Sequence, residues 1–205
     1  MDSTTESMTH VYDGLAGDYD RVYGRTLDRG RRLGIQAMAI ESGMRVLEIG
    51  IGTGLSLALY PPGTHLVGID NSREMLARAR ERLTRLPPGD VELAEMSGER
   101  LEFPDGSFDR IFAPSVLTAM SHPEAAVAEM ARVCKPSGRI CVVSHFSGGG
   151  PAALLDRMLD PISRRYLGYR CTLQRSILED NPALRIVRKR QVLPYLNTLY
   201  LLERA

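Results

Sequence analysis

Three glycines at alternate positions, directly after a short apolar stretch, constrain this chain more than any other feature. The stretch reads Val46-Leu47-Glu48-Ile49-Gly50-Ile51-Gly52-Thr53-Gly54. Residues 46 to 49 have strand character, and glycine lets the turn after a strand adopt backbone angles that other residues avoid. Bare backbone also lets a ligand lie directly against the main chain. The motif therefore predicts a ligand-binding turn between a β-strand and a helix.

The spacing of the glycines and the neighbouring charge indicate the kind of ligand. The spacing is G-x-G-x-G, whereas the turn that wraps a dinucleotide pyrophosphate reads G-x-G-x-x-G. Glu48 precedes the first glycine. A carboxylate at this point repels phosphate and attracts a cationic or hydroxyl-bearing ligand. Both points favour S-adenosylmethionine over NAD.

Strand-like and helix-like segments alternate through the middle of the chain. We expect Ser72 to cap the second helix, and proline pairs at 61–62 and 87–88 to end the first two. This rhythm predicts a parallel sheet with helices on both faces. The expected strands cover 46–49, 65–70, 91–94, 108–112 and 138–145, and the expected helices cover 55–60, 72–86 and 123–133.

The two ends of the chain break this rhythm. Residues 10–23 have helical periodicity but contain two glycines, each of which costs about 1 kcal/mol of helix stability, so we expect a mobile lid there. A second helix is expected over 26–41. Near the other end we expect a helical segment over 152–180 that is interrupted at Pro161, followed by strands at 184–192 and 196–203.

The length of 205 residues predicts one domain that buries roughly two-thirds of its unfolded surface. No apolar run approaches the ~18 residues that cross a bilayer, and the polar, acidic start resembles neither a signal peptide nor a transit peptide. We therefore expect a cytoplasmic protein. Its expected parts are a lid with helices (1–42), a cofactor-binding core (43–147), a helical insertion for substrate or membrane (148–181) and a strand pair (182–205).

Cysteines and charges indicate further properties. Cys134, Cys141 and Cys171 lack the spacing of metal ligands, so we expect buried apolar side chains and no bound metal. The net charge is only +1, but basic residues cluster at 21–32 and again after His145. A codon bias toward arginine explains the excess of arginine over lysine, but not the clustering. The clusters favour an anionic membrane surface as partner, and no nucleic acid is expected.

An ordered set of motifs resembles the class I S-adenosylmethionine-dependent methyltransferases over nearly the whole chain. A shorter match, YDGLAGDYDRVY at 12–23 and HFSGGGPAALLDRMLDPISRRYLGYR at 145–170, is similar to the soluble bacterial phosphatidylethanolamine N-methyltransferases. The resemblance implies a Rossmann-like α/β fold, with a mostly parallel seven-stranded sheet of order 3-2-1-4-5-7-6 and the ligand across the carboxyl ends of its strands. The first set comprises VLEIGIGTG (46–54), GID (68–70), SREMLARAR (72–80), LEFPDGSFDRI (101–111) and EMARVCKPSGRI (129–140).

The resemblance also assigns residues to a site for S-adenosylmethionine, whose product is S-adenosylhomocysteine. Asp70 is expected to accept both ribose hydroxyls, and Glu48 to meet the methionine end. Met75 lies either on the adenine face or in the core. Ser97 stands where many relatives carry an acid that binds adenine, so its hydroxyl or backbone N–H groups take that contact. The other expected contacts are Tyr19, Gly50, Gly52, Thr53, Gly54, Asn71, Met96, Ala113 and Pro114.

Methyl transfer to an amine requires alignment, exclusion of water and removal of a proton from the ammonium. Tyr19 matches the lid tyrosine of the family and reaches the cofactor or the amine, unless it only packs on its helix. His145, at the end of an expected strand, either accepts the proton or is structural. Aromatic rings attract a quaternary ammonium, and Tyr166, Tyr169 and Tyr195 either share that role or only pack at the surface. Tyr12, on the lid, is also expected to contact the substrate.

A lipid substrate needs arginines for its phosphodiester and an apolar surface for its acyl chains. Leu155, Met158, Leu159 and Ile162 share one helical stripe, with arginines beside it. The pattern is typical of an interfacial helix, and also of a helix packed on the sheet with a solvated basic face. We expect the phosphate to be bound by Arg164 and Arg170.

These features predict a monomeric, peripherally membrane-bound enzyme on the inner face of the membrane. It would methylate phosphatidylethanolamine stepwise to phosphatidylcholine. One alternative keeps the fold and changes the acceptor to a quinone precursor or another small molecule. Another is a non-catalytic cofactor-binding module, against which Glu48, Asp70 and the lid tyrosines count.

Overall fold

The protein is built around one seven-stranded sheet. The computed structural model describes residues 19–147, 151–166, 168–193 and 197–205. The strand order is β3-β2-β1-β4-β5-β7-β6, with β7 antiparallel to both its neighbours and the other pairs parallel, which confirms the predicted topology. The strands are β1 (Arg45–Ile49), β2 (His65–Asp70), β3 (Asp90–Glu95), β4 (Phe108–Pro114), β5 (Cys134–Ser144), β6 (Leu184–Leu193) and β7 (Asn197–Arg204).

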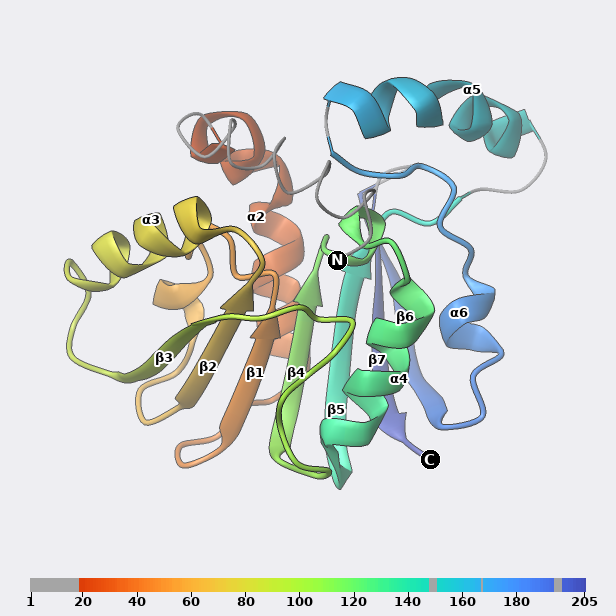
Figure 1. The fold of residues 1–205 in the computed structure, drawn as a ribbon. Helices are drawn as coiled ribbons and strands as arrows, with labels where there is room; N and C mark the ends of the chain where they lie inside the picture. The colour runs from red at the N-terminus through yellow and green to blue at the C-terminus, as the bar shows by residue number, and fades with distance from the viewer. Residues whose placement is uncertain (1–18, 148–150, 167, 194–196) are drawn as a thin grey trace.

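Helices cover both faces of the sheet (Figure 1). The apolar clusters assign α2 and α3 to one face and α4 and α6 to the other. Among the described residues, every helix is too short or too polar to cross a bilayer. The helices are α2 (Tyr19–Ala37), α3 (Arg73–Leu83), α4 (Pro123–Val133), α5 (Pro151–Tyr166) and α6 (Ser176–Glu179), with short 3-10 turns η1 (Leu57–Leu59) and η2 (Leu117–Ala119).

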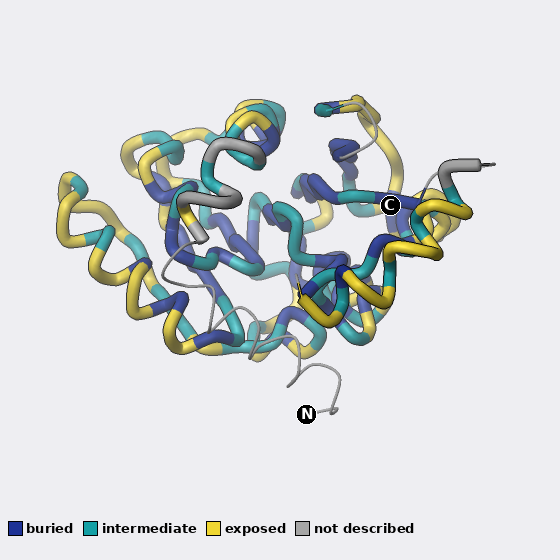
Figure 2. The backbone as a smooth tube through the Cα atoms, turned by 90° about the horizontal axis from the view of Figure 1, so that it is seen from above, coloured by how far each residue is buried: buried dark blue, intermediate teal, exposed yellow. Residues whose placement is uncertain are grey.

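Buried residues lie along the strands in the middle of the molecule, whereas exposed residues lie on the outer turns of the helices (Figure 2). Side chains alternate across β1, so Leu47 and Ile49 join the cluster that contains α4, and Val46 joins the cluster that contains α3. On α2, a Cβ at Gly34 would lie 2.4 Å from the ring of Phe112. Glycine at this position therefore lets α2 pack closely against the sheet.

The structure corrects three local expectations. Residues 55–60 form turns around η1 instead of an α-helix, because the glycine turn and Pro61 leave room for only one 3-10 turn. From residue 19 onward, the two helices expected near the N-terminus are one helix, and residues 10–18 lie outside the described residues. The helix α5 continues through Pro161, where an interruption was expected. All three cysteines are buried and unpaired, as predicted.

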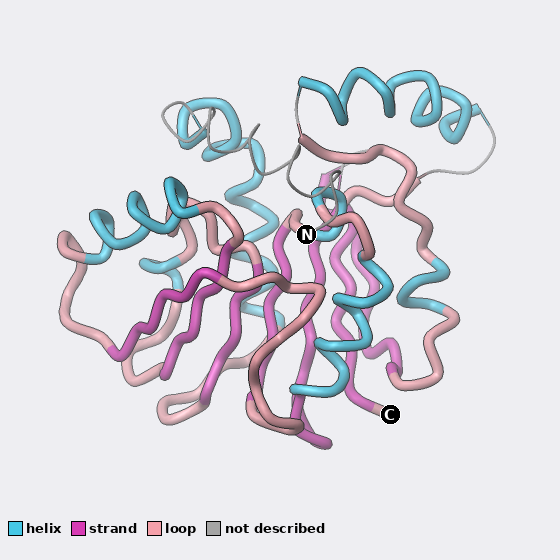
Figure 3. The backbone as a smooth tube through the Cα atoms, in the orientation of Figure 1, coloured by secondary structure: helices cyan, strands magenta, loops and turns pink. Residues whose placement is uncertain are grey.

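The two edges of the sheet are built differently. The parallel strands end on one side, in loops that gather at the top of Figure 3, and α5 lies above this carboxyl edge. Residues Gly50 to Gly54, Asn71, Ser97 and Ser115 belong to these loops or turns. The carboxyl edge therefore collects the segments in which the sequence predicted the site.

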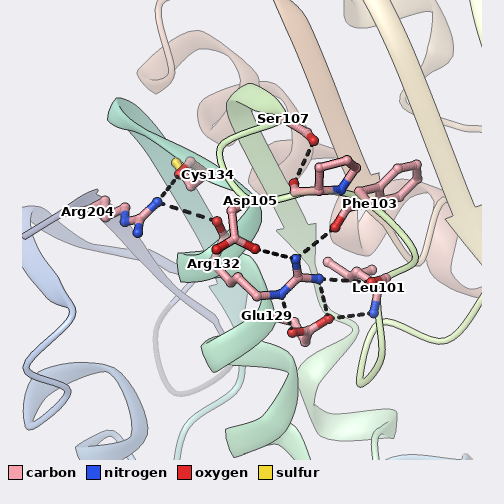
Figure 4. A network of polar contacts seen from close by, with 9 residues as sticks. Leu101, Phe103, Asp105, Ser107, Glu129, Arg132, Cys134 and Arg204 are labelled. Atoms are coloured by element: carbon pink, nitrogen blue, oxygen red, sulfur yellow. Dashed lines mark hydrogen bonds and ion pairs between the residues drawn. The ribbon is translucent and has the colours of Figure 1, made fainter.

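At the opposite, amino edge, a network of ion pairs and hydrogen bonds joins α4 to the loop before β4 (Figure 4). Arg132 donates to the carbonyls of Leu101 and Phe103 at 2.9 and 2.8 Å, and to the carboxylates of Glu129 and Asp105 at 2.7 and 2.8 Å. The second oxygen of Glu129 accepts from the N–H of Leu101 at 2.7 Å. One guanidinium thus anchors a loop that has no regular secondary structure of its own.

Candidate active site

The glycine turn after β1 has the geometry that the motif predicted. Gly50, Gly52 and Gly54 have φ angles of 74°, 55° and 77°, in the left-handed region that favours glycine. A Cβ at Gly50 would lie 2.5 Å from Val116, and one at Gly54 would lie 2.6 Å from Leu57, whereas nothing lies within 4 Å of that position at Gly52. Packing therefore requires two of the glycines, and the third faces open space.

Asp70 ends β2 and is tied to the glycine turn. Its Oδ2 accepts from the N–H of Gly52 at 2.8 Å, and its Oδ1 accepts from the N–H of Ser72 at 3.0 Å. The parallel register of β1 and β2 sets Ile49 beside Ile69 and brings these groups together. Each carboxylate oxygen can accept more than one hydrogen bond, so the same group can hold the turn and accept ribose hydroxyls.

Glu48 is buried, with 1% of its surface exposed, and two hydroxyl groups hold its carboxylate. The Oγ of Ser56 lies 2.8 and 2.7 Å from the two oxygens, and the hydroxyl of Tyr60 donates at 2.7 Å. Burial raises the pKa of Glu48 to about 7, against the lowering effect of Ser56, Tyr60 and the charge of Arg31. The site thus contains a carboxyl group that can gain or lose a proton near neutral pH.

Thr53 connects the glycine turn to the start of α2. Its Oγ1 donates to Oδ1 of Asp20 at 2.5 Å, and Arg82 pairs with the other oxygen of Asp20. Arg82 also donates to the carbonyl of Thr53 at 2.9 Å. The backbone of Tyr19 therefore lies next to a residue that contacts the turn, while the side chain of Tyr19 is not among those described.

Residues after β2 and β3 form the next part of the predicted site. Ser72 caps α3 by accepting from the N–H of Met75 at 3.1 Å, as predicted, and Met75 itself is 2% exposed. Asn71, directly before the cap, is half-buried. Met96 donates its N–H to the carbonyl of Asp70 at 3.1 Å, and Ser97 accepts from the N–H of Glu99 at 3.2 Å. The hydroxyl hydrogen of a serine that accepts in this way can still be donated to a ligand.

The end of β4 contains a strained residue that the sequence did not predict. Ala113 is buried, Pro114 is half-buried, and Ser115 has a φ of 58°, which is uncommon for a residue other than glycine. The N–H of Ser115 donates to the carbonyl of Val143 at 2.6 Å. Strained backbone of this kind clusters at functional sites, and no side-chain pattern in the sequence marked it.

The residues predicted to bind or deprotonate the substrate have different partners in the structure. His145 follows β5, with its Nε2 3.3 Å from Oδ1 of Asp156 on α5. Arg164 pairs with Asp160 at 2.6 Å. The guanidinium of Arg170 instead donates to the carbonyls of Met120 and Ser121 at 2.7 and 3.1 Å, and its backbone N–H donates to the carbonyl of Thr118 at 2.8 Å. Arg170 thus fastens the chain after α5 to the turn after β4. Tyr12 and Tyr195 lie outside the described residues.

Sequence reasoning missed Asp20, Ser56 and Tyr60 at this site. Asp20 lies 33 positions before Thr53, and nothing local predicts their contact. Ser56 and Tyr60 meet Glu48 only because the chain turns tightly after the glycines, where a helix was expected. A search for hydroxyl side chains within a dozen residues of the motif acid would have found the last two.

The residues present fit S-adenosylmethionine. Gly52 faces open space, the carboxylate of Asp70 is fixed beside it, and the acid Glu48 is buried nearby. These features suit a ligand that carries ribose hydroxyls and positive charge. When bound, this cofactor supplies a methyl group already activated on a sulfonium. The polypeptide binds and aligns the reactants and excludes water.

Comparisons with known proteins agree with this geometry. Residues 47–142 match a family model described as a methyltransferase domain. A phosphatidylethanolamine N-methyltransferase of Cereibacter sphaeroides is 37% identical over 178 residues, which cover 86% of this chain and 87% of that one. The ubiquinone/menaquinone C-methyltransferase UbiE of Ectopseudomonas mendocina is 30% identical over 172 residues, which cover 79% and 66%.

A solved structure supports the same fold. A SAM-dependent methyltransferase from Aquifex aeolicus superposes with a TM-score of 0.69 at 20% identity, over 94% of this chain and 98% of that one. At this identity the likeness concerns the fold alone, whereas the relative from Cereibacter is similar enough to define the family. This chain belongs to the family of class I S-adenosylmethionine-dependent methyltransferases.

Proposed function

We propose that this methyltransferase acts on phosphatidylethanolamine at a membrane surface and methylates it stepwise to phosphatidylcholine. The relative from Cereibacter, named for this activity, matches over most of both chains and at higher identity than the UbiE relative. The feature of the molecule itself that carries the proposal is the surface of α5.

The helix α5 exposes a stripe of large apolar side chains. Its members are between 44% and 69% exposed, whereas elsewhere in the described chain only Ile186 and Val187 are large, apolar and exposed. Contiguous apolar surface of this kind is rare unless something covers it. With Arg157 and Arg165 exposed on the same helix, the stripe suits the interface of an anionic bilayer. The apolar stripe consists of Leu154, Leu155, Met158, Leu159, Ile162 and Tyr166.

The position of α5 suits a lipid substrate. It lies above the carboxyl edge of the sheet (Figure 1), and Asp156 on its inner side approaches His145 at the end of β5. A bilayer in contact with the apolar stripe would therefore lie close to the cofactor-binding loops. The amine of the lipid must lose a proton before its nitrogen attacks the methyl group, and we propose His145 or Tyr19 as the group that accepts or orients this proton.

Labelled lipid analysis tests the acceptor. The purified protein is incubated with methyl-labelled S-adenosylmethionine and vesicles that contain phosphatidylethanolamine, and the lipids are separated by thin-layer chromatography. We expect label in the mono-, di- and trimethylated lipids. Label in a demethylated quinone but not in the lipids would support the C-methyltransferase alternative. Cofactor binding without turnover on either acceptor would support a non-catalytic module.

Cosedimentation tests the membrane surface. We expect the protein to sediment with acidic vesicles but not neutral ones, and less at high salt, because exposed arginines contribute to the attraction. Replacing Leu155 and Met158 with aspartate should weaken attachment at least tenfold, since each buried apolar side chain contributes about 1.5–3 kcal/mol. The matched control replaces Ile186 and Val187 of β6 with aspartate and should attach normally. Equal attachment of both double variants would contradict the assignment of α5.

A further inference from the structure

Two hydroxyl side chains hold the buried carboxylate of Glu48. Its donors, Ser56 and Tyr60, come from the segment around η1, directly after the glycine turn. Burial, together with the charge of Glu48, raises the pKa of Tyr60 far above its ordinary value, so its hydroxyl stays protonated and donates. Both hydroxyls therefore stabilise the ionised form of a carboxyl group that burial pushes toward the neutral form.

Glu48 lies close enough to the cofactor loop to respond to the cofactor's charge. It is two residues from Gly50, a separation of about 7 Å along a strand. S-adenosylmethionine carries a sulfonium and an ammonium, and a cation near a buried carboxylate favours its ionised form. We propose that Ser56 and Tyr60 are positioning residues that hold Glu48 ready to ionise, so that binding of the cationic cofactor releases a proton from Glu48 to solvent.

Three other ionisable groups lie around Glu48. Arg31 approaches from α2 and Asp70 from β2, and both influence the pKa of Glu48. Arginine stays protonated at all relevant pH values. Cys141 of β5 lies near Tyr60, but burial raises the pKa of its thiol, so it stays neutral. Glu48 itself has a pKa of about 7, close to neutrality.

Calorimetry in buffers of different ionisation enthalpy tests the inference, because it counts the protons released on binding. The probes are S-adenosylmethionine and S-adenosylhomocysteine, without any methyl acceptor. With a pKa of about 7 for Glu48, binding at pH 7 should release about half a proton. In Glu48→Gln this release should disappear. If wild-type protein binds the cofactor with no proton release at pH 7, the inference is overturned.

Removing one hydroxyl distinguishes positioning from packing. Loss of a hydrogen bond to a charged group should raise the pKa of Glu48 by about one unit in Tyr60→Phe. Affinity relative to wild type should then fall about fivefold at pH 7 and less than about twofold at pH 8. The α-amino group of the cofactor also titrates near pH 8, but it does so equally with both proteins. A deficit of the same size at pH 6 and pH 8 would show that Tyr60 acts only through packing.

Two further variants complete the experiment. Ser56→Ala should shift the pH dependence in the same direction as Tyr60→Phe, so the test does not rest on one variant. Tyr200→Phe is the matched control, because Tyr200 on β7 donates to Glu179 on α6 at 2.6 Å, away from the glycine turn. It should leave the proton count and the affinity unchanged. The experiment needs the cofactor only, so its result does not depend on whether the acceptor is phosphatidylethanolamine.

Discussion

Two carboxylates at the amino edge of the sheet have lowered pKa values, whereas Glu48 at the carboxyl edge has a raised one. At the amino edge, hydrogen bonds from Arg132 hold the pKa of Glu129 below its usual range. Burial alone would raise the pKa of Asp109, but bonds from Lys135 and from the N–H of Arg45 outweigh it and lower that pKa. At the carboxyl edge, hydroxyl groups are the hydrogen-bond donors to Glu48, and burial raises its pKa to about 7.

The opposite pKa shifts distinguish carboxylates that stabilise the fold from a carboxylate that is suited to bind a ligand. A carboxylate that a guanidinium and an N–H group both satisfy stabilises the fold and titrates far from neutral pH. A buried carboxylate whose hydrogen-bond donors are hydroxyls costs stability, and it is suited to receive a cation that arrives with a ligand. We therefore expect the loss of a charge at the amino edge to lower stability, and the loss of the Glu48 charge at the carboxyl edge to raise stability and alter binding.

The largest effect should follow from Arg132→Met. It leaves Glu129 without its charged partner and removes donors from the carbonyls of Leu101 and Phe103, at a cost of about 3 kcal/mol in the free energy of unfolding. Urea titration measures the loss. The control is Arg85→Met, whose exposed pair with Glu81 should contribute less than about 0.5 kcal/mol. Equal losses in both variants would contradict the structural role of the amino edge.

The second effect should have the opposite sign. The folded-state pKa of Glu48 is about 7 against an ordinary 4.5, so the folded protein keeps a proton that the unfolded chain loses. Wild-type stability therefore falls as pH rises from 4.5 to about 7. Glu48→Gln should remove this penalty and gain about 2–3 kcal/mol more at pH 8 than at pH 5. Thermal unfolding at both pH values measures the gain, and a pH-independent effect would contradict it.

Much of this contrast was predictable from sequence, because the features concerned are local. The glycine turn, the acid before it and Asp70 at the end of the second strand follow from backbone chemistry within a few residues. Arg170 shows what such reasoning misses. Its charge and neighbours predicted a phosphate ligand, yet its guanidinium donates to the carbonyls of Met120 and Ser121, some 50 positions earlier. Which carbonyls need a donor depends on how distant segments meet, and sequence periodicity does not encode that.

The next prediction concerns the affinity for the cofactor product. Asp70→Asn keeps the shape of the side chain but removes its charge and half of its capacity to accept hydrogen bonds. We expect the affinity for S-adenosylhomocysteine to fall about 30-fold, which corresponds to about 2 kcal/mol. The control is Asp105→Asn at the amino edge, which should leave the affinity unchanged. Unaltered binding by Asp70→Asn would show that Asp70 does not hold the ribose.

The smallest effect should come from the ion pair that joins α2 to the glycine turn. Arg82 and Asp20 are 34% and 43% exposed, so solvent screens their attraction, and Asp20→Asn should cost less than about 1 kcal/mol of stability. The amide oxygen of the introduced asparagine can still accept from Thr53, which limits the loss further. Urea titration should place this variant near wild type and well above Arg132→Met. A loss as large as that of Arg132→Met would mean that the carboxyl edge, too, depends on its charges for folding, and the division between the two edges would fail.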